Sequence, residues 1–336
     1  AGTSTGSLIA PLVVLSKEDP SQIDRLKDIY MSVTTEDIIV AHPLVEAVVS
    51  EDALYDATPL RALIEEDIDE AASEALFASE TQMFITGVNL NTGQTVFFQT
   101  GPRAVNRDPS TRLVPVRDRE TLIRAIEAST HVPVFMPPVE VLAGAESEDI
   151  GDDDTGDDDT GDGAGRLPLK PTDRYVDGGV RDIAPIKMAI DNGATDVYAI
   201  VLTTSERKRN ANPYRSVVDI LTRTVDLFTQ EITKKDVGIA ALFNEGARYL
   251  ASLKAKITER TELSADDVEE LFESVDALNP FRDTNVVNLH VIRPEEKLPG
   301  SALEFKPLEM AKLMRLGRKR ARAVLDGEDD RLPLIA

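Results

Sequence analysis

A serine flanked by glycines near the start of the chain is the residue best suited to chemistry. Gly2-Thr3-Ser4-Thr5-Gly6 has the pattern Gly-x-Ser-x-Gly, and an apolar stretch that fits a helix, residues 8–15, follows it. In a nucleophile elbow such a serine sits at a strained turn from a strand into a helix. Glycines at positions 2 and 6 give the backbone room to fold back, and the N–H of Thr5 at the helix start would help to stabilise an oxyanion. The pentapeptide alone also fits a plain glycine-rich loop.

A serine is a weak nucleophile at neutral pH, so it needs a base. The strongest candidate is Asp177 in Tyr175-Val176-Asp177-Gly178-Gly179. An apolar approach followed by an aspartate and two glycines describes a strand end that presents a carboxylate, with a tight turn behind it. A turn that simply requires Asp and Gly would have the same residues.

Histidine is the commoner base, and the chain has three: His42, His131 and His290. Each fits an ordinary structural role. A triad of Ser4, an aspartate and His290 would have the chain order of an α/β-hydrolase, so that alternative stays open. The chain has no cysteine, which excludes disulfides, thiolate metal sites and a cysteine nucleophile.

The composition is that of an acidic globular protein. Asp and Glu outnumber Lys and Arg by 60 to 37, which gives a formal net charge of -23. Such a surface repels phosphates within about one Debye length, roughly 8 to 10 Å, so we expect no nucleic-acid partner. No apolar run approaches the ~20 residues that span a bilayer. A soluble protein, with a cytoplasmic location favoured, is therefore expected.

Apolar periodicity and turn residues predict a mixture of helices and strands. Residues 83–90 and 95–99 flank Asn91-Thr92-Gly93, which predicts an antiparallel hairpin. Residues 197–202 form a continuous apolar run, typical of a strand that is buried on both faces. This order favours an α/β layered fold. Further expected elements are helices at 122–129, 185–192 and 307–325 and a strand at 286–292.

Residues 145–165 depart from this pattern. They contain Gly-Asp-Asp-Asp-Thr twice, at Gly151 and at Gly156, and almost nothing apolar. Such a segment cannot repay the entropy of ordering it, so we expect a disordered acidic insertion. The aspartate spacing resembles a calcium loop, but no glutamate closes it and no helices flank it. Because the motifs on its two sides need one another, we expect a single domain over residues 1–336.

The last expected helix carries a basic cluster. Such a cluster is usually a solvated helix face, and the alternative is a peripheral contact with anionic lipid. The cations are Arg315, Arg318, Lys319, Arg320 and Arg322, and the same helix carries Leu313, Leu316 and Val324.

Taken together, the motifs resemble the patatin-like phospholipase family, in which a Gly-x-Ser-x-Gly serine and the aspartate of Asp-Gly-Gly or Asp-Gly-Ala form a dyad without histidine. Residues 128–139 are similar to the family's Ala-Ser-x-x-x-Pro-x-x-Phe-Pro-Pro stretch, displaced by one residue near its end. Residues 177–193 are similar to its Asp-Gly-Gly followed by a helix that ends at Asn-Gly-Ala. Residues 87–93 resemble its strand and turn with Asn-x-x-x-Gly. The likeness covers most of residues 1–205 and, more loosely, 288–323.

The resemblance implies a three-layer α/β fold with a central, mostly parallel sheet and helices on both faces. It also implies a serine acyl hydrolase that cleaves lipid acyl esters, as a phospholipase A does, without a metal or an organic cofactor. Ser4 would be the nucleophile and Asp177 the general base. Support for the elbow and the oxyanion would come from Gly2, Thr5, Gly6, Gly178 and Gly179.

One departure from the family concerns the oxyanion. Family members carry a glycine-rich oxyanion loop on a strand before the elbow, and no such residues precede Gly2. We therefore expect a fragment or trimmed form that lacks this strand and loop, with reduced activity, because one lost oxyanion donor costs about 100-fold to 1,000-fold in rate. Two alternatives remain: a soluble carboxylesterase or thioesterase with the same dyad, and a catalytically silent module that binds lipid or a partner.

Overall fold

A computed structural model describes residues 1–42, 52–142, 167–205, 214–275, 279, 281, 286–299 and 304–327. The expected acidic insertion, residues 145–165, lies outside the described residues. In chain order the elements are β1 (Gly2–Thr3), α1 (Thr5–Leu15), α2 (Ser21–Ser32), η1 (Thr35–Asp37), β2 (Val40–Ala41), β3 (Tyr55–Asp56), α4 (Thr58–Asp67), α5 (Glu70–Ala78), β4 (Met83–Asn89), β5 (Thr95–Thr100), β6 (Thr111–Pro115), α6 (Arg119–Thr130), β7 (Tyr175–Asp177), η2 (Gly178–Val180), α7 (Ile186–Asp191), β8 (Asp196–Ile200), α8 (Val217–Arg260), α9 (Ala265–Glu273), β9 (Asn288–Ile292) and α10 (Pro307–Leu325).

The central sheet has the strand order β1-β4-β5-β6, and β7 also pairs with β4. Strand β4 is parallel to β1 and antiparallel to β5 and β7, whereas β5 is parallel to β6. Strands β8 and β9 form a separate parallel pair. Apart from the short β2–β3 ribbon, three of the five pairings between described strands are thus parallel.

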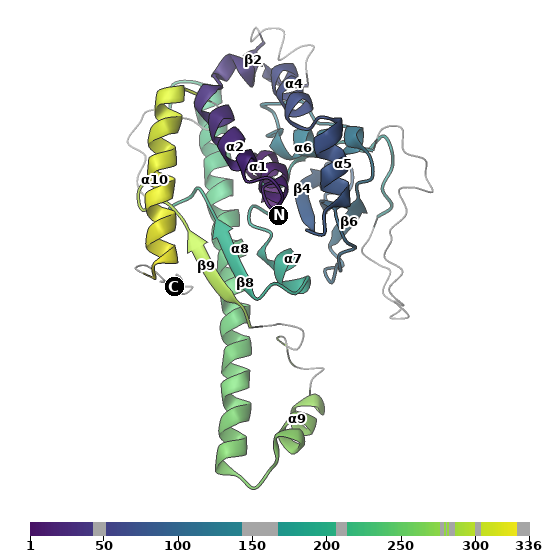
Figure 1. The fold of residues 1–336 in the computed structure, drawn as a ribbon, viewed down its shortest axis with the longest axis vertical. Helices are drawn as coiled ribbons and strands as arrows, with labels where there is room; N and C mark the ends of the chain where they lie inside the picture. Colours follow the sequence, from purple (N-terminus) through teal and green to yellow (C-terminus); the bar gives the residue numbers. More distant parts are fainter. Residues whose placement is uncertain are drawn as a thin grey trace.

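Side chains along β4 and β5 alternate between two apolar clusters. Ile85 and Phe98 belong to the large cluster that α1 and α6 complete. Phe84 and Phe97 point to the opposite face, where they pack with Met188 of α7. Helices therefore cover both faces of the sheet, which confirms the expected three-layer α/β fold. Figure 1 shows the long α8 running past this body, with its second half and α9 projecting from it.

The predicted hairpin is confirmed, and Asn89 at the end of β4 organises its turn. The Asn89 side-chain oxygen accepts the N–H groups of Asn91 and Thr92, and Gly93 takes a positive φ of 74°. The side-chain amide nitrogen of Asn89 donates to the Asp173 carboxylate at 2.8 Å. Because β7 begins two residues after Asp173, this one buried amide ties the hairpin turn to the entrance of β7.

The prediction of a strand buried on both faces at residues 197–202 is wrong in one respect. Strand β8 forms there, but Tyr198 and Ile200 are exposed while Val197 and Ala199 are buried. The reason is that β8 pairs with β9 in a two-stranded sheet of which only one face packs on α7 and α8. A run of apolar residues does not reveal whether one face or two will be covered.

The other expected elements form. Helices α1, α6, α7 and α10 and strand β9 lie where the sequence places them, and Gly193 follows α7 with a φ of 86°. None of the helices in the described part of the chain has the length and apolar character needed to cross a membrane.

We expect Asn89→Ala to lower the free energy of unfolding by about 2 to 4 kcal/mol, because it removes one of two hydrogen bonds to the buried Asp173 carboxylate and leaves two turn N–H groups without their partner. Urea unfolding followed by circular dichroism measures the change. Asn91→Ala is the matched control: this exposed side chain accepts one N–H, from Arg174, so its loss should cost less than about 1 kcal/mol. Equal losses in the two variants would contradict the role given to Asn89.

Candidate active site

The turn from β1 into α1 is strained and is held by hydrogen bonds. Ser4 has φ 55° and ψ -125°, a conformation that costs a residue other than glycine about 1 to 3 kcal/mol and is typical of a nucleophile elbow. The Ser4 carbonyl accepts the N–H and the hydroxyl of Ser7, at 2.8 and 2.6 Å. The Ser4 N–H donates to the Ser129 hydroxyl at 3.1 Å. These contacts fix the serine at the start of a helix.

Two neighbouring residues of β4 bring the elbow to the predicted base. Thr3 of β1 pairs with Thr86, and Asp177 of β7 pairs with the next residue, Gly87. Strands β1 and β7 therefore meet along β4, with the end of one beside the end of the other. Ser4, which follows Thr3 directly, lies next to Asp177 for this reason.

Asp177 is buried, with 5% of its surface exposed. The Ser4 hydroxyl donates a hydrogen bond to its carboxylate, and the Gly179 N–H donates another at 2.7 Å. Burial raises the pKa of Asp177 to about 6, and the two hydrogen bonds oppose the rise because they favour the ionised form. The carboxylate is thus ionised at neutral pH and basic enough to take a proton.

The C-terminal end of α6 contacts both residues of this pair. Ser129 accepts the Ser4 N–H, and the His131 carbonyl accepts the Asp177 N–H at 2.9 Å. Ser129 belongs to the family-like stretch of residues 128–139, but the sequence alone assigns it no role. Its position in that stretch was the available signal. The contact itself could not be foreseen, because Ser4 and Ser129 lie 125 residues apart.

The glycines of the two motifs differ in how strictly the backbone requires them. A Cβ on Gly2 would lie 2.1 Å from the Gly6 carbonyl oxygen, and one on Gly178 would lie 2.5 Å from the Thr86 carbonyl oxygen. A Cβ on Gly179 would approach an Asp177 carboxylate oxygen at 3.0 Å. By contrast, a Cβ on Gly6 would have no neighbour within 4 Å. The expectation that Gly6 gives the backbone room to fold back is therefore wrong, since Gly6 lies in the first turn of α1 with open space beside it.

Thr5 is the first residue of α1, directly after Ser4. The first N–H groups of a helix have no partner within the helix, and they carry the positive end of its dipole. The N–H of Thr5 is therefore one of the N–H groups at the start of α1 that a bound oxygen could accept from.

The contacts described for the histidine side chains lie away from the Ser4–Asp177 pair. His131 is buried, with Nδ1 2.6 Å from the Pro137 carbonyl oxygen. His290 stacks on the ring of Tyr198 in the β8–β9 sheet. His42 follows β2. Among the described residues, the hydrogen bonds to the Asp177 carboxylate come from the Ser4 hydroxyl and the Gly179 N–H.

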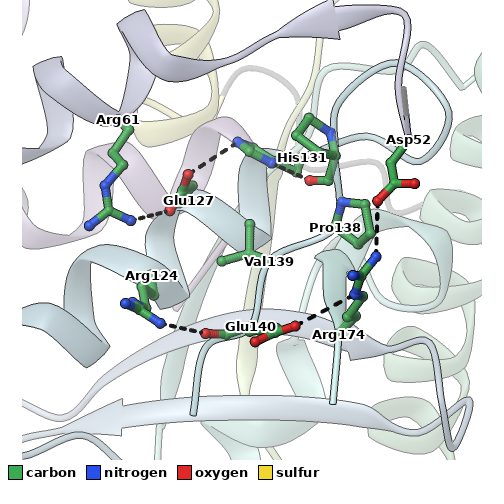
Figure 2. Close-up of a pocket in the computed structure, with 10 residues that line it drawn as sticks. Asp52, Arg61, Arg124, Glu127, His131, Pro138, Val139, Glu140 and Arg174 are labelled. Atoms are coloured by element: carbon green, nitrogen blue, oxygen red, sulfur yellow. Dashed lines mark hydrogen bonds and ion pairs between the residues drawn. The ribbon is translucent and has the colours of Figure 1, made fainter. Parts of the chain in front are cut away.

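A pocket of about 320 Å³ at the C-terminal end of α6 is lined by charged side chains that form ion pairs and by the buried His131 (Figure 2). Glu127 lies between Arg61, at 2.9 Å, and the Nε2 atom of His131, at 4.0 Å. Arg174 pairs with Asp52 at 3.0 Å. The arginines of this pocket already have carboxylate partners. Their ion pairs form a network that supports the C-terminal end of α6. In the described part of the chain, no cluster of three or more His, Asp or Glu side chains could hold a metal ion.

The profile of the Patatin-like phospholipase family matches residues 1–190, which is more than half of the chain and includes both motifs and the whole central sheet. A comparison with curated proteins finds no match.

The glycine contacts lead to a test by paired substitutions. We expect Gly2→Ala to lower the free energy of unfolding by at least about 2 kcal/mol, because its Cβ collides with backbone. Gly6→Ala should raise it, by up to about 1 kcal/mol, because alanine is the better helix former and the space is open. Thermal unfolding of the two variants beside the wild type measures both changes. A destabilised Gly6→Ala protein would contradict the geometry of the elbow.

Proposed function

This chain belongs to the patatin-like phospholipase family, a family of lipid acyl hydrolases, and from that premise we propose that it cleaves lipid acyl esters through a Ser4–Asp177 dyad. The observation that carries the proposal is the hydrogen bond from the Ser4 hydroxyl to the buried Asp177 carboxylate. Support also comes from the strained elbow, which presents the serine at a helix N-terminus.

In the first step the Ser4 oxygen attacks the ester carbonyl carbon while Asp177 accepts the hydroxyl proton. Negative charge develops on the carbonyl oxygen, where the Thr5 N–H can donate a hydrogen bond. When the tetrahedral intermediate collapses, the C–O bond to the alcohol breaks and the alcohol takes the proton from Asp177. The acyl group stays on Ser4 as an ester.

In the second step water replaces the alcohol. Asp177 accepts a proton from the water as its oxygen attacks the acyl-enzyme, and the fatty acid leaves as Ser4 regains its proton. The same carboxylate therefore acts once in each half of the cycle. A pKa of about 6 suits this task, because a general base works best when its pKa is close to the working pH.

A fluorophosphonate probe tests the nucleophile. We expect one equivalent of probe to label Ser4, and Ser4→Ala to abolish both labelling and hydrolysis. Ser32→Ala, at the exposed end of α2, is the control that should retain both. Peptide mapping that places the label on another serine would refute the assignment. Full hydrolytic activity without labelling at Ser4 would do the same.

The base gives a pH signature. We expect kcat/KM for a soluble ester to rise about tenfold per pH unit up to about pH 6 and then to level off, because only ionised Asp177 can accept the proton. Asp177→Asn should remove nearly all turnover with the fold intact by circular dichroism. A variant that keeps wild-type rates, or a wild type with no acid limb, would reject Asp177 as the base.

Substrate form distinguishes lipid hydrolysis from general esterase activity. We expect faster turnover of micellar phospholipid than of short soluble esters or thioesters at equal ester concentration. Turnover of short esters alone would favour a carboxylesterase or thioesterase with the same dyad. Binding of lipid without turnover in any substrate would favour a catalytically silent module.

A further inference from the structure

The outer face of α10 carries a group of cations that lack ion-pair partners among the described residues. All are exposed, and they lie on the side of the helix that faces away from the protein. Arg320, which belongs to the basic cluster in the sequence, is different: it is turned inward, where it donates to the Arg293 carbonyl and pairs with Glu295. The outer basic face of α10 consists of Lys312, Arg315, Arg318, Lys319 and Arg322.

This face stands out in a chain with a net charge of -23. Elsewhere in the protein, Arg61, Arg174 and Lys254 each pair with carboxylates. Like charges one helical turn apart repel one another. Neighbouring cations on this face therefore repel one another, and a polyanionic surface would relieve the repulsion by neutralising them together.

Exposed leucines lie along the same helix. Leu308, Leu316 and Leu325 have 81%, 51% and 60% of their surfaces exposed. Cations provide attraction to lipid phosphates, and leucines gain from entering the boundary between headgroups and acyl chains. The same helix borders a surface depression of about 480 Å³, where four cations and one carboxylate surround a space that could take a phosphate headgroup. It is lined by Arg315, Arg318, Lys319, Arg322, Ala323 and Asp326.

Helix α10 is firmly joined to the helical layer that carries the elbow. It packs on α2 and β9, and α2 packs on α1, whose first residue follows Ser4 (Figure 1). The Phe305 N–H, just before α10, donates to the Thr35 hydroxyl at 2.9 Å, which ties the helix to η1 after α2. A membrane that held α10 would therefore hold the layer in which the candidate nucleophile lies.

We propose that the outer basic face of α10 docks the protein on bilayers rich in anionic lipid. A bilayer is favoured over nucleic acid because a flat surface can touch this face alone, whereas a long polyanion would also meet the acidic remainder of the protein. The exposed leucines have a role at a bilayer and none on a phosphate backbone. The inference concerns binding and does not depend on hydrolysis.

Vesicle co-sedimentation tests the proposal in a Ser4→Ala background, so that its outcome is independent of catalysis. We expect binding to vesicles of phosphatidylcholine and phosphatidylglycerol in equal parts, little binding to phosphatidylcholine alone, and weaker binding as salt is raised. Each basic residue near an anionic surface contributes about fivefold in affinity, so Arg315→Glu, Lys319→Glu and Arg322→Glu together should weaken binding at least about 100-fold.

The matched control makes the same change of charge on α8, with Lys234→Glu, Lys256→Glu and Arg260→Glu, all at exposed positions. This control should bind anionic vesicles like its Ser4→Ala parent. Equal losses in the two triple variants, or equal binding to neutral and anionic vesicles, would overturn the proposal. Tighter binding to a DNA duplex than to anionic vesicles would overturn it in favour of a nucleic-acid partner.

Discussion

The pairing of two consecutive residues in β4 is the constraint on which the rest of the structure depends. Thr86 pairs with Thr3 and Gly87 pairs with Asp177, so one strand sets the distance between two parts of the chain that are far apart in sequence. The elbow, the carboxylate and their hydrogen bond follow from that register. A slip of either β1 or β7 by one residue along β4 would turn that strand's side chains to the opposite face and separate the pair.

The end of α6 gives this arrangement its second support. It accepts the N–H of Ser4 through the Ser129 hydroxyl and the N–H of Asp177 through the His131 carbonyl. Both residues are costly to hold where they are: one has a strained backbone, and the other is a buried carboxylate with a raised pKa. Strain and desolvation of this kind collect at functional sites, where surrounding contacts maintain them.

The sequence alone was sufficient for those features that local residues determine. The hairpin followed from Asn91-Thr92-Gly93, because the turn residues themselves set its geometry. The fold class and the candidate pair followed from family-like motifs. The role of Ser129 was missed because it depends on a partner far away in the chain. The exposed face of β8 was missed because apolar composition does not show how many faces of a strand are covered. The role expected of Gly6 was wrong because a motif does not show which of its glycines are crowded by neighbouring atoms.

The most direct test is an NMR titration of the Asp177 carboxyl carbon in protein labelled at aspartate, with Asp177→Asn to assign the signal. The account predicts a pKa near 6 in the wild type and a higher pKa in Ser4→Ala, because removing the hydroxyl removes a hydrogen bond that favours the ionised form. A pKa in the ordinary range of aspartate that Ser4→Ala leaves unchanged would show that the hydroxyl and the carboxylate do not meet, and would contradict the dyad.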